Sequence, residues 1–400
     1  WKPNTIVVRT ILDSFRRTIH TRPPCLQQTE PKPRLMIFLN SHKLQIYGVA
    51  LWWWSLSLLS IPGFVVNAAK PVGIHLDIEV HSLTDWNNHH QDWGNEWLDL
   101  MVKLDVASGT VPLTVDVAMQ YSTVVMVERN GVTKSLADWA LELGIRHVVL
   151  MAYRDYGTVE DCPQTHHEDC GATDSIEFHS QDLMNLARPN TTIKIGVETN
   201  PTALPDKVNF GVEGEWYMEH VLETVTEHFL PTPQFEGLVV HDFEHATDTS
   251  FTNTSLRDTA SSRSCRSVWM WDDCYVLGDV SKPSCPATKT PESLVTIAQQ
   301  YSIDNIIVNA RWFFVLETYR DDLKRFVDVL GKNGISVELL LADYSWSREI
   351  NHATAVDHVE KAVAFINDMT GSVTEAFHCV PIRSDNPVTT NMPSSTPSSI

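Results

Sequence analysis

From residue 70 onward, short apolar runs alternate with segments whose apolar residues recur at helical spacing. Short runs rich in Val, Ile and Leu are typical of strands buried in a parallel sheet. The pattern predicts strands at residues 73–79, 113–118, 147–153, 193–198, 237–241, 268–271, 305–309 and 336–342. It predicts helices between them, among others at 135–144, 215–230, 291–302, 318–334 and 355–368. Eight strands tied together by helices favour a TIM-like (β/α)8 barrel over an open sheet.

The chain outside this region differs in composition. Residues 1–44 carry a net charge of +6, whereas the whole chain carries −20. Residues 370–400 are rich in Ser, Thr and Pro, which is typical of a disordered or O-glycosylated tail. We therefore expect one acidic barrel domain at residues 70–369, preceded by a basic and disordered arm. Because phosphate binding needs basic surface, this charge argues against nucleic acid as a partner.

Residues 45–69 are apolar and contain no charged side chain. About twenty apolar residues are enough to cross a bilayer, and basic flanks stay on the cytoplasmic side. The segment can be a signal anchor that holds the barrel at a membrane. It can also be a signal peptide that begins near Met36, with residues 66–68 as its cleavage site, or a buried core helix. Both targeting interpretations place the barrel in the secretory pathway, either membrane-anchored or secreted.

The cysteines and two glycosylation sequons agree with export. The sequons begin at Asn190 and Asn253. Cys162 and Cys170 bracket one predicted loop and are a plausible disulfide in an oxidising compartment. Three further cysteines, Cys265, Cys274 and Cys285, crowd another loop, so one of them needs a different partner, such as Cys379. A zinc site is the rival interpretation, although the sequence has no CxxC pair.

Side chains that can take part in catalysis or ligand binding lie at or just after the end of every predicted strand. In a parallel barrel, functional residues collect where the strands end. One Asp at a strand end usually caps the next helix, but polar groups at all eight strand ends predict a ligand site. The candidates in chain order are His75, Asp77, Glu79, His81, Asp116, Gln120, Tyr153, Arg154, Asp155, Glu198, His241, Asp242, Trp271, Asp272, Asp273, Asn309, Arg311, Asp343 and Trp346.

Two segments resemble one enzyme family. "VGIHLDIEVH", residues 72–81, resembles the strand-4 signature D-G-x-D-x-D-x-E of chitinase-like family 18 glycoside hydrolases, with Val72 and His75 in place of its first two acids. "LMAYRDYG", residues 150–157, resembles the M-x-Y-D segment of strand 6, with Arg154 in place of the Asp. The resemblance covers roughly residues 70–245. It implies that Glu79 is the general acid, that Asp77 orients a substrate N-acetyl group, and that Tyr153 steadies the resulting intermediate.

The chemistry of the acidic pair supports the same roles independently of the family. Residues i and i+2 of a strand face the same way, so Asp77 and Glu79 are expected to lie together, with His75 on that face as well. Two neighbouring carboxyls raise each other's pKa, so one of them can stay protonated near neutral pH and act as a general acid.

The order of the units is unusual for this family. Residues 332–368 resemble its third βα unit, which the 73–79 strand would normally follow. Here that strand comes first instead. The chain can be a circularly permuted barrel, with strands 4–8 followed by strands 1–3, or a fragment of a tandem array.

Other chemistries compete with acetamido-assisted hydrolysis. If the permutation holds, Glu198 ends strand 7, where many barrel glycosidases place a nucleophile. Carboxyls about 5 Å apart would then give retention, and about 6.5–9.5 Å inversion. The aromatic residues that could stack on a sugar are Tyr153, Trp271, Trp312 and Trp346.

The rivals from other classes are a metal-dependent barrel hydrolase or lyase and a non-catalytic carbohydrate-binding or incomplete barrel. The possible ligands of a divalent ion are His75, Asp77, Glu79, Asp116, His241 and Asp242. No Gly-rich phosphate loop, G-x-S-x-G elbow or Walker motif is present. We therefore expect a carbohydrate substrate and no cofactor.

Overall fold

The computed structural model describes residues 71–163, 170–203, 205–211, 213–246, 266–282, 284–311, 313 and 319–369. The predicted basic arm 1–44, the apolar segment 45–69 and the tail 370–400 lie outside these residues, as do Asn253, Cys265, Trp312 and Cys379. Within the described part of the chain, no helix has the length and apolar character needed to cross a membrane.

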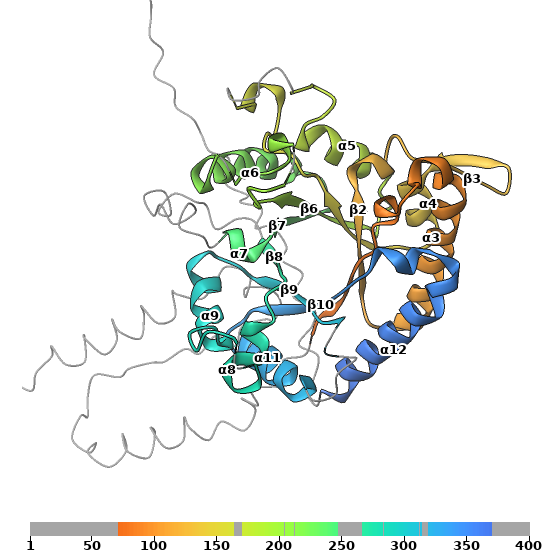
Figure 1. Ribbon diagram of the computed structural model, residues 1–400. Coiled ribbons are helices and arrows are strands. Elements are labelled where there is room, and N and C mark those ends of the chain that lie inside the picture. The colour runs from red at the N-terminus through yellow and green to blue at the C-terminus, as the bar shows by residue number, and fades with distance from the viewer. Residues whose placement is uncertain are drawn as a thin grey trace, which may run out of the picture.

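The eight predicted strands form one closed parallel barrel, which confirms the (β/α)8 prediction. The ring order is β1-β10-β9-β8-β7-β6-β5-β2, so the strands follow one another around the barrel in chain order (Figure 1). Their bounds are β1 Gly73–Asp77, β2 Leu113–Ala118, β5 His147–Met151, β6 Thr192–Glu198, β7 Phe235–His241, β8 Arg266–Met270, β9 Asn305–Asn309 and β10 Ser336–Ala342.

The barrel closes between the first strand and the last. Residues Gly73–Asp77 of β1 pair with residues 338–342 of β10 over their whole length, and Ile74 also begins a shorter pairing with β2 at Leu113. The early and late groups of strands therefore belong to one ring and share one set of strand ends.

Helices cover the outside of the ring, and α12 packs beside α3 although the two lie at opposite ends of the described chain (Figure 1). The five helices expected at particular ranges are α4, α6, α9, α11 and α12, and all five are present. The helix bounds are α3 Trp86–Ser108, α4 Leu136–Glu142, α5 Ile176–Leu186, α6 Glu215–Phe229, α7 Phe243–Ala246, α8 Cys274–Ser281, α9 Pro291–Gln300, α11 Arg320–Lys332 and α12 His352–Asp368.

Local sequence fixes several of these helix ends. The Thr290 side chain accepts a hydrogen bond from the Ser293 amide, and Pro291 occupies the first turn of α9, where its missing N–H costs nothing. Ser135 and Ser175 cap α4 and α5 in the same way. After α11, Gly334 has φ +79°, a left-handed conformation that glycine adopts without strain.

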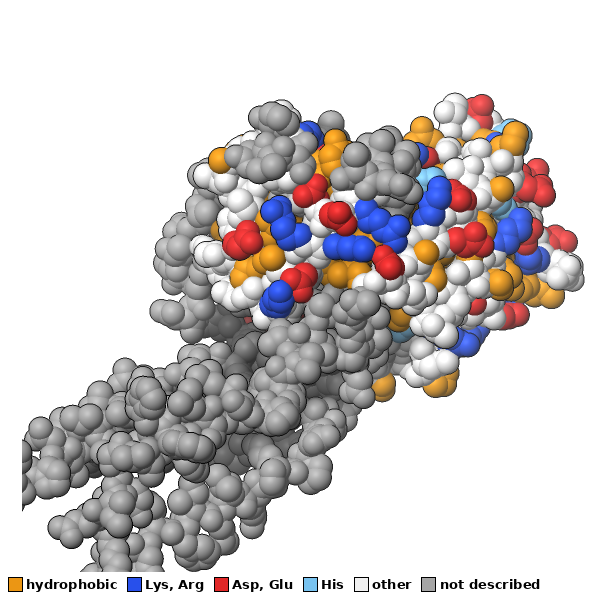
Figure 2. Space-filling view, turned by 90° about the horizontal axis from the view of Figure 1, so that it is seen from below, with side chains coloured by type: hydrophobic (Ala, Val, Ile, Leu, Met, Phe, Trp, Pro, Cys, Tyr) orange, Lys and Arg blue, Asp and Glu red, His pale blue; other side chains and the backbone are white. Residues whose placement is uncertain are grey.

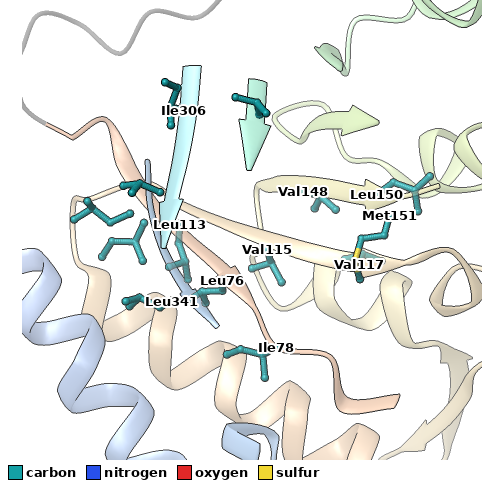
Figure 3. Close-up of a cluster of buried hydrophobic side chains, with 14 of the residues drawn as sticks. Leu76, Ile78, Leu113, Val115, Val117, Val148, Leu150, Met151, Ile306 and Leu341 are labelled. Atoms are coloured by element: carbon teal, nitrogen blue, oxygen red, sulfur yellow. The ribbon is translucent and has the colours of Figure 1, made fainter. Parts of the chain in front are cut away.

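The outer strand faces and the helices share a large apolar core. Leu76, Val115 and Leu341 are fully buried members of it and lie between strands and helices (Figure 3). A second, smaller cluster fills the inside of the barrel, as the layers of a packed barrel interior require. It consists of Val149, Val239, Trp269, Ile307 and Leu340.

One glycine is needed to fit the large ring inside the barrel. A Cβ atom on Gly196 of β6 would come within 2.9 Å of the Trp269 ring and 3.1 Å of the Leu150 carbonyl oxygen. Backbone at this position therefore approaches the indole more closely than any other residue type allows.

Shorter elements connect the barrel units. An antiparallel hairpin of β3 (Met126–Arg129) and β4 (Val132–Ser135) precedes α4. The hydrophobic pattern did not predict this hairpin. Six short 3₁₀ helices also occur in the described chain: η2 Val80–Ser82, η3 Met119–Tyr121, η4 Val159–Asp161, η6 Asp206–Val208, η10 Tyr344–Ser347 and η11 Glu349–Asn351. On the face seen from below, basic and acidic side chains are interleaved (Figure 2).

Two disulfides lie in the described chain. Cys162–Cys170 is the predicted pair, and Cys274–Cys285 pairs two of the three cysteines that crowd the later loop. Disulfides persist in oxidising compartments, so both are compatible with an extracellular or secretory location. Asn190, which begins the first sequon, is exposed.

Candidate functional site

Six polar or aromatic side chains from six different strands meet at the carboxyl ends of the barrel strands. They are Asp77, Asp116, Tyr153, Glu198, His241 and Trp271, and we call this end of the barrel the mouth. The Tyr153 ring stacks on the His241 ring with 6.0 Å between centroids. Burial raises the pKa of the Tyr153 hydroxyl far above its usual value, and the charges of Asp116, Glu198, Asp77 and Glu79 raise it further. Tyr153 therefore stands among four carboxylates that come from three separate segments of the sequence.

Asp77 is the most perturbed acid of this group. Its Oδ1 atom is buried and has no hydrogen-bond partner. Burial raises the pKa of Asp77 well above its usual value, the charges of Asp116 and Glu79 raise it further, and His75 and His241 oppose them. The neutral acid is thus favoured, as expected of a carboxyl surrounded by other carboxyls.

Glu79 lies just beyond the end of β1 and is more accessible. The predicted strand extended to Glu79, but β1 ends at Asp77 and Glu79 begins the 3₁₀ turn η2. Its side chain is 32% exposed, and its Oε2 accepts a hydrogen bond of 2.7 Å from the Ser82 hydroxyl. Glu79 is therefore the more accessible acid of the pair, and it lies beside a carboxyl for which the neutral form is favoured.

Glu198 is held by hydrogen bonds at both oxygens. Its Oε1 accepts from the amides of Thr199 (2.8 Å) and Asn200 (2.7 Å), and its Oε2 lies 2.6 Å from Nδ1 of His241. The side chain is only 7% exposed. Glu198 is therefore a fixed hydrogen-bond acceptor inside the wall of the mouth.

His241 joins Glu198 to Trp271. The indole N–H of Trp271 donates to Nε2 of His241 (2.9 Å), so Nδ1 carries the imidazole proton and donates to Glu198. Burial alone would lower the pKa of His241, but its hydrogen bond to Glu198 and that residue's charge outweigh burial and raise it. Full protonation would break the indole hydrogen bond, because both nitrogens would then be donors.

Beneath Asp77, His75 is completely buried between two carboxylates. Its Nε2 lies 2.8 Å from Asp116 and its Nδ1 lies 3.2 Å from Glu338. Burial lowers the pKa of His75, but the charges and hydrogen bonds of Asp116 and Glu338 outweigh it and raise the pKa to about 9. Glu338 in turn pairs with Lys194 across the barrel (2.9 Å). His75, expected as a ligand contact, is therefore a charged residue of the barrel interior.

The unfolding free energy should depend on pH through His75. Its pKa rises from 6.5 to about 9 on folding, so its stabilisation is complete below about pH 6.5 and is lost as the pH rises through about 9. The shift corresponds to on the order of 3 kcal/mol. Urea unfolding between about pH 6 and 9 measures it. A His75→Gln variant should lack this part of the slope, and equal slopes in the two proteins would contradict the assignment.

Other predicted residues have structural contacts or stand apart. Arg154 is buried and pairs with Asp174 (2.5 Å). Asp343 accepts from the Ser345 amide and pairs with Arg311, which also lies over the Trp346 ring. Trp346 is only 2% exposed, so it has no ring face open to a ligand in this structure.

Four further candidates lie at or just beyond the ends of their strands. Asp155 is fully buried, and its amide donates to the Lys207 carbonyl (3.0 Å). The carbonyl of the buried Asp242 accepts from the Thr199 hydroxyl (3.1 Å). Gln120 in η3 and Asn309 at the end of β9 are half-buried. Their predicted ligand contacts stay predictions.

Potential metal ligands gather just beyond Trp271, at the start of α8. Among the described residues, Asp273, Cys274 and Cys285 form the one group of three whose ligand atoms lie within 4.8 Å of one another. Its two cysteines are joined in a disulfide, which removes the thiolates that would bind a metal.

Sequence reasoning missed three residues of the barrel interior, namely Lys194, Asn305 and Glu338. Asn305 donates to Glu338 (2.8 Å) and thus joins the same network as His75. The available signal was a charged residue in the middle of each of two apolar strands, "TIKIGVE" and "SVELLLA". Two opposite charges at inward positions can neutralise each other across a barrel.

No protein-family model matches the chain, and a search of curated proteins finds no match.

Proposed function

We propose that this barrel is a glycoside hydrolase that cleaves glycosidic bonds in a polysaccharide or glycoconjugate by carboxylate acid/base catalysis. The observation that carries the proposal is the pairing of two acids with different surroundings. The Oδ1 atom of Asp77 is buried and has no partner, whereas the Glu79 side chain beyond it is 32% exposed. Such a difference between neighbouring carboxyls is how one site can hold both a proton donor and a charged stabilising group.

The proposed mechanism is assisted by a substrate acetamido group. Asp77 passes its proton to Glu79, and Glu79 donates a proton to the glycosidic oxygen while the acetamido oxygen attacks the anomeric carbon and the leaving group departs. Asp77, ionised by that transfer, accepts the acetamido N–H, and the Tyr153 hydroxyl steadies the cyclic intermediate. Glu79, now ionised, then removes a proton from the water that reopens the ring at the anomeric carbon. Two inversions at that carbon give net retention.

The acetamido-assisted mechanism is favoured over one in which Glu198 is the nucleophile, because the contacts of Glu198 leave it no free oxygen. Both of its oxygens already accept hydrogen bonds, from two amides and from His241, and the side chain is almost entirely buried. A nucleophile has to reach the anomeric carbon with a free lone pair. Glu198 instead fixes His241 and Trp271, whose rings form the wall beside Tyr153.

Two further proposals concern the whole chain. We infer that its strands correspond to strands 4–8 followed by 1–3 of the family 18 barrel. The pairing of β1 with β10 supports this order, because it puts the third unit directly before the "GIHLD" strand in the ring. We also propose that the barrel works in the secretory pathway, either secreted or anchored through residues 45–69. The two disulfides support this location.

A panel of fluorogenic glycosides tests the function. The wild-type protein should release 4-methylumbelliferone from β-glycosides of N-acetylglucosamine oligomers, and it should leave the matched glucose oligomers, which have a 2-hydroxyl group, intact. Proton NMR of the first product should show retained anomeric configuration. Hydrolysis of both series would favour the two-glutamate mechanism. Failure to cleave any member of a wide panel would reject the hydrolase.

A further inference from the structure

Four charged side chains form a continuous chain of contacts through the barrel beneath the mouth. Lys194 of β6 contacts Glu338 of β10 (2.9 Å), Glu338 contacts His75 of β1 (3.2 Å), and His75 contacts Asp116 of β2 (2.8 Å). The side chains of His75, Asp116 and Glu338 are at most 6% exposed. The chain begins deep inside the barrel and ends at Asp116, which belongs to the candidate site.

The His75 ring is fixed in one orientation. Both of its nitrogens are bound to carboxylates, and the edge-to-face contact with Trp269 (5.8 Å between centroids) packs its flank. Trp269 in turn occupies the space that Gly196 leaves open. These three contacts keep Nε2 of His75 directed at Asp116.

Stability alone does not require this arrangement. Buried ion pairs can often be replaced by well-packed apolar side chains without loss of stability, so their presence in a barrel interior needs another reason. The interior already contains an apolar cluster that includes Leu340 and Ile307 on the same strands as Glu338 and Asn305. The series of charged contacts ends at Asp116, beside Asp77, so a role in the candidate site is one such reason.

We propose that His75 is a positioning residue of the candidate site: it holds Asp116 beside Asp77 and ties that carboxylate to the buried Glu338–Lys194 pair. The inference rests on the proposed glycosidase function. His75 itself has no exposed surface and therefore touches no substrate.

The register of β1 and β2 places Asp116 beside both His75 and Asp77. His75 and Asp77 are two residues apart on one strand, and His75 pairs with Thr114, two residues before Asp116 on the neighbouring strand. Asp116 thus stands next to both residues. The charge of Asp116 is, after burial, the largest influence that raises the pKa of Asp77. The other titratable groups that act on Asp77 are Glu79, His75 and His241.

A double-mutant cycle tests the proposal. The variants are His75→Gln, Asp116→Asn and the double variant, assayed with the N-acetylglucosamine glycoside cleaved by the wild type. Loss of orientation should lower kcat by about 100-fold in each single variant and leave KM within about threefold. Because both changes break the same link, the double variant should be no worse than the poorer single variant. Leu330→Ala, a cavity in α11 remote from the mouth, controls for lost stability and should keep the wild-type kcat.

Three other outcomes of these experiments would contradict the positioning role of His75. If folded His75→Gln keeps the wild-type kcat, or if the two losses multiply, His75 does not act through Asp116, while the glycosidase function stands. If His75→Gln fails to fold, Asp116→Asn decides alone, since a wild-type kcat there excludes the role. If the wild-type protein cleaves no glycoside, the proposed function fails and the positioning role fails with it.

Discussion

Replacing Glu79 with glutamine should lower kcat for the N-acetylglucosamine glycoside by about 10²–10⁴-fold, because the amide cannot donate the proton that the leaving oxygen needs. The substitution keeps the size of the side chain and an oxygen that can accept from Ser82. KM should therefore change little. Steady-state kinetics with the fluorogenic substrate measure both constants.

The leaving group makes the assignment of Glu79 more specific. An aryl glycoside whose phenol is already acidic needs little help from a general acid, so the loss should be smaller with such a leaving group. Glu142→Gln on α4 provides the matched control, since Glu142 pairs with Lys134 on the surface. Equal activity of wild-type and Glu79→Gln proteins on a glycoside with a poor leaving group would remove Glu79 from the mechanism.

Replacing Lys194 with methionine should lower the free energy of unfolding by about 3–5 kcal/mol, the cost of leaving a buried carboxylate without its cation. Asn305 cannot compensate for the loss of the Lys194 ammonium, because it donates one hydrogen bond to Glu338 but carries no charge. Glu338 depends on that cation, because the charge of Lys194 lowers the pKa of Glu338 against the effect of burial. Urea denaturation followed by circular dichroism measures the loss.

A second change should reverse most of that loss. Adding Glu338→Gln to Lys194→Met removes the charge that was left alone, so the double variant should be more stable than Lys194→Met. The surface pair of Lys324 and Asp368 serves as the comparison, and Lys324→Met should cost about 1 kcal/mol at most. A buried and an exposed lysine variant of equal stability would show that the interior pair contributes no more than a surface one.

The fold could be predicted from the sequence because its main signal is local. Each strand is a short run of apolar residues, and the runs alternate with amphipathic helices, so their number and order led directly to a closed barrel. The ends of the strands were less accurate. Strand β5 stops at Met151, two residues before its predicted end, and the Ala152 amide is shared between the Leu150 carbonyl and the Gly196 carbonyl of β6, which no apolar pattern records.

The site could be predicted only in outline. Strand ends identify which residues reach the mouth, and Asp77, Tyr153, Glu198 and His241 do meet there. Their partners could not be predicted, because they depend on contacts across the ring. Lys194 and Glu338 belong to strands that are not neighbours in the barrel, and only the closed structure brings them together. For the same reason, Arg154 was predicted from the sequence as a ligand contact, whereas the fold pairs it with Asp174.

The seam between β1 and β10 has a consequence for biosynthesis. Until residue 342 has left the ribosome, β1 lacks the strand that occupies its second edge, and Glu338 is missing from beneath His75. The growing polypeptide then presents an open edge and an incomplete mouth, the kind of surface that recruits chaperones or pairs with other chains. Premature termination anywhere before that point should therefore yield insoluble material instead of a weaker version of the protein.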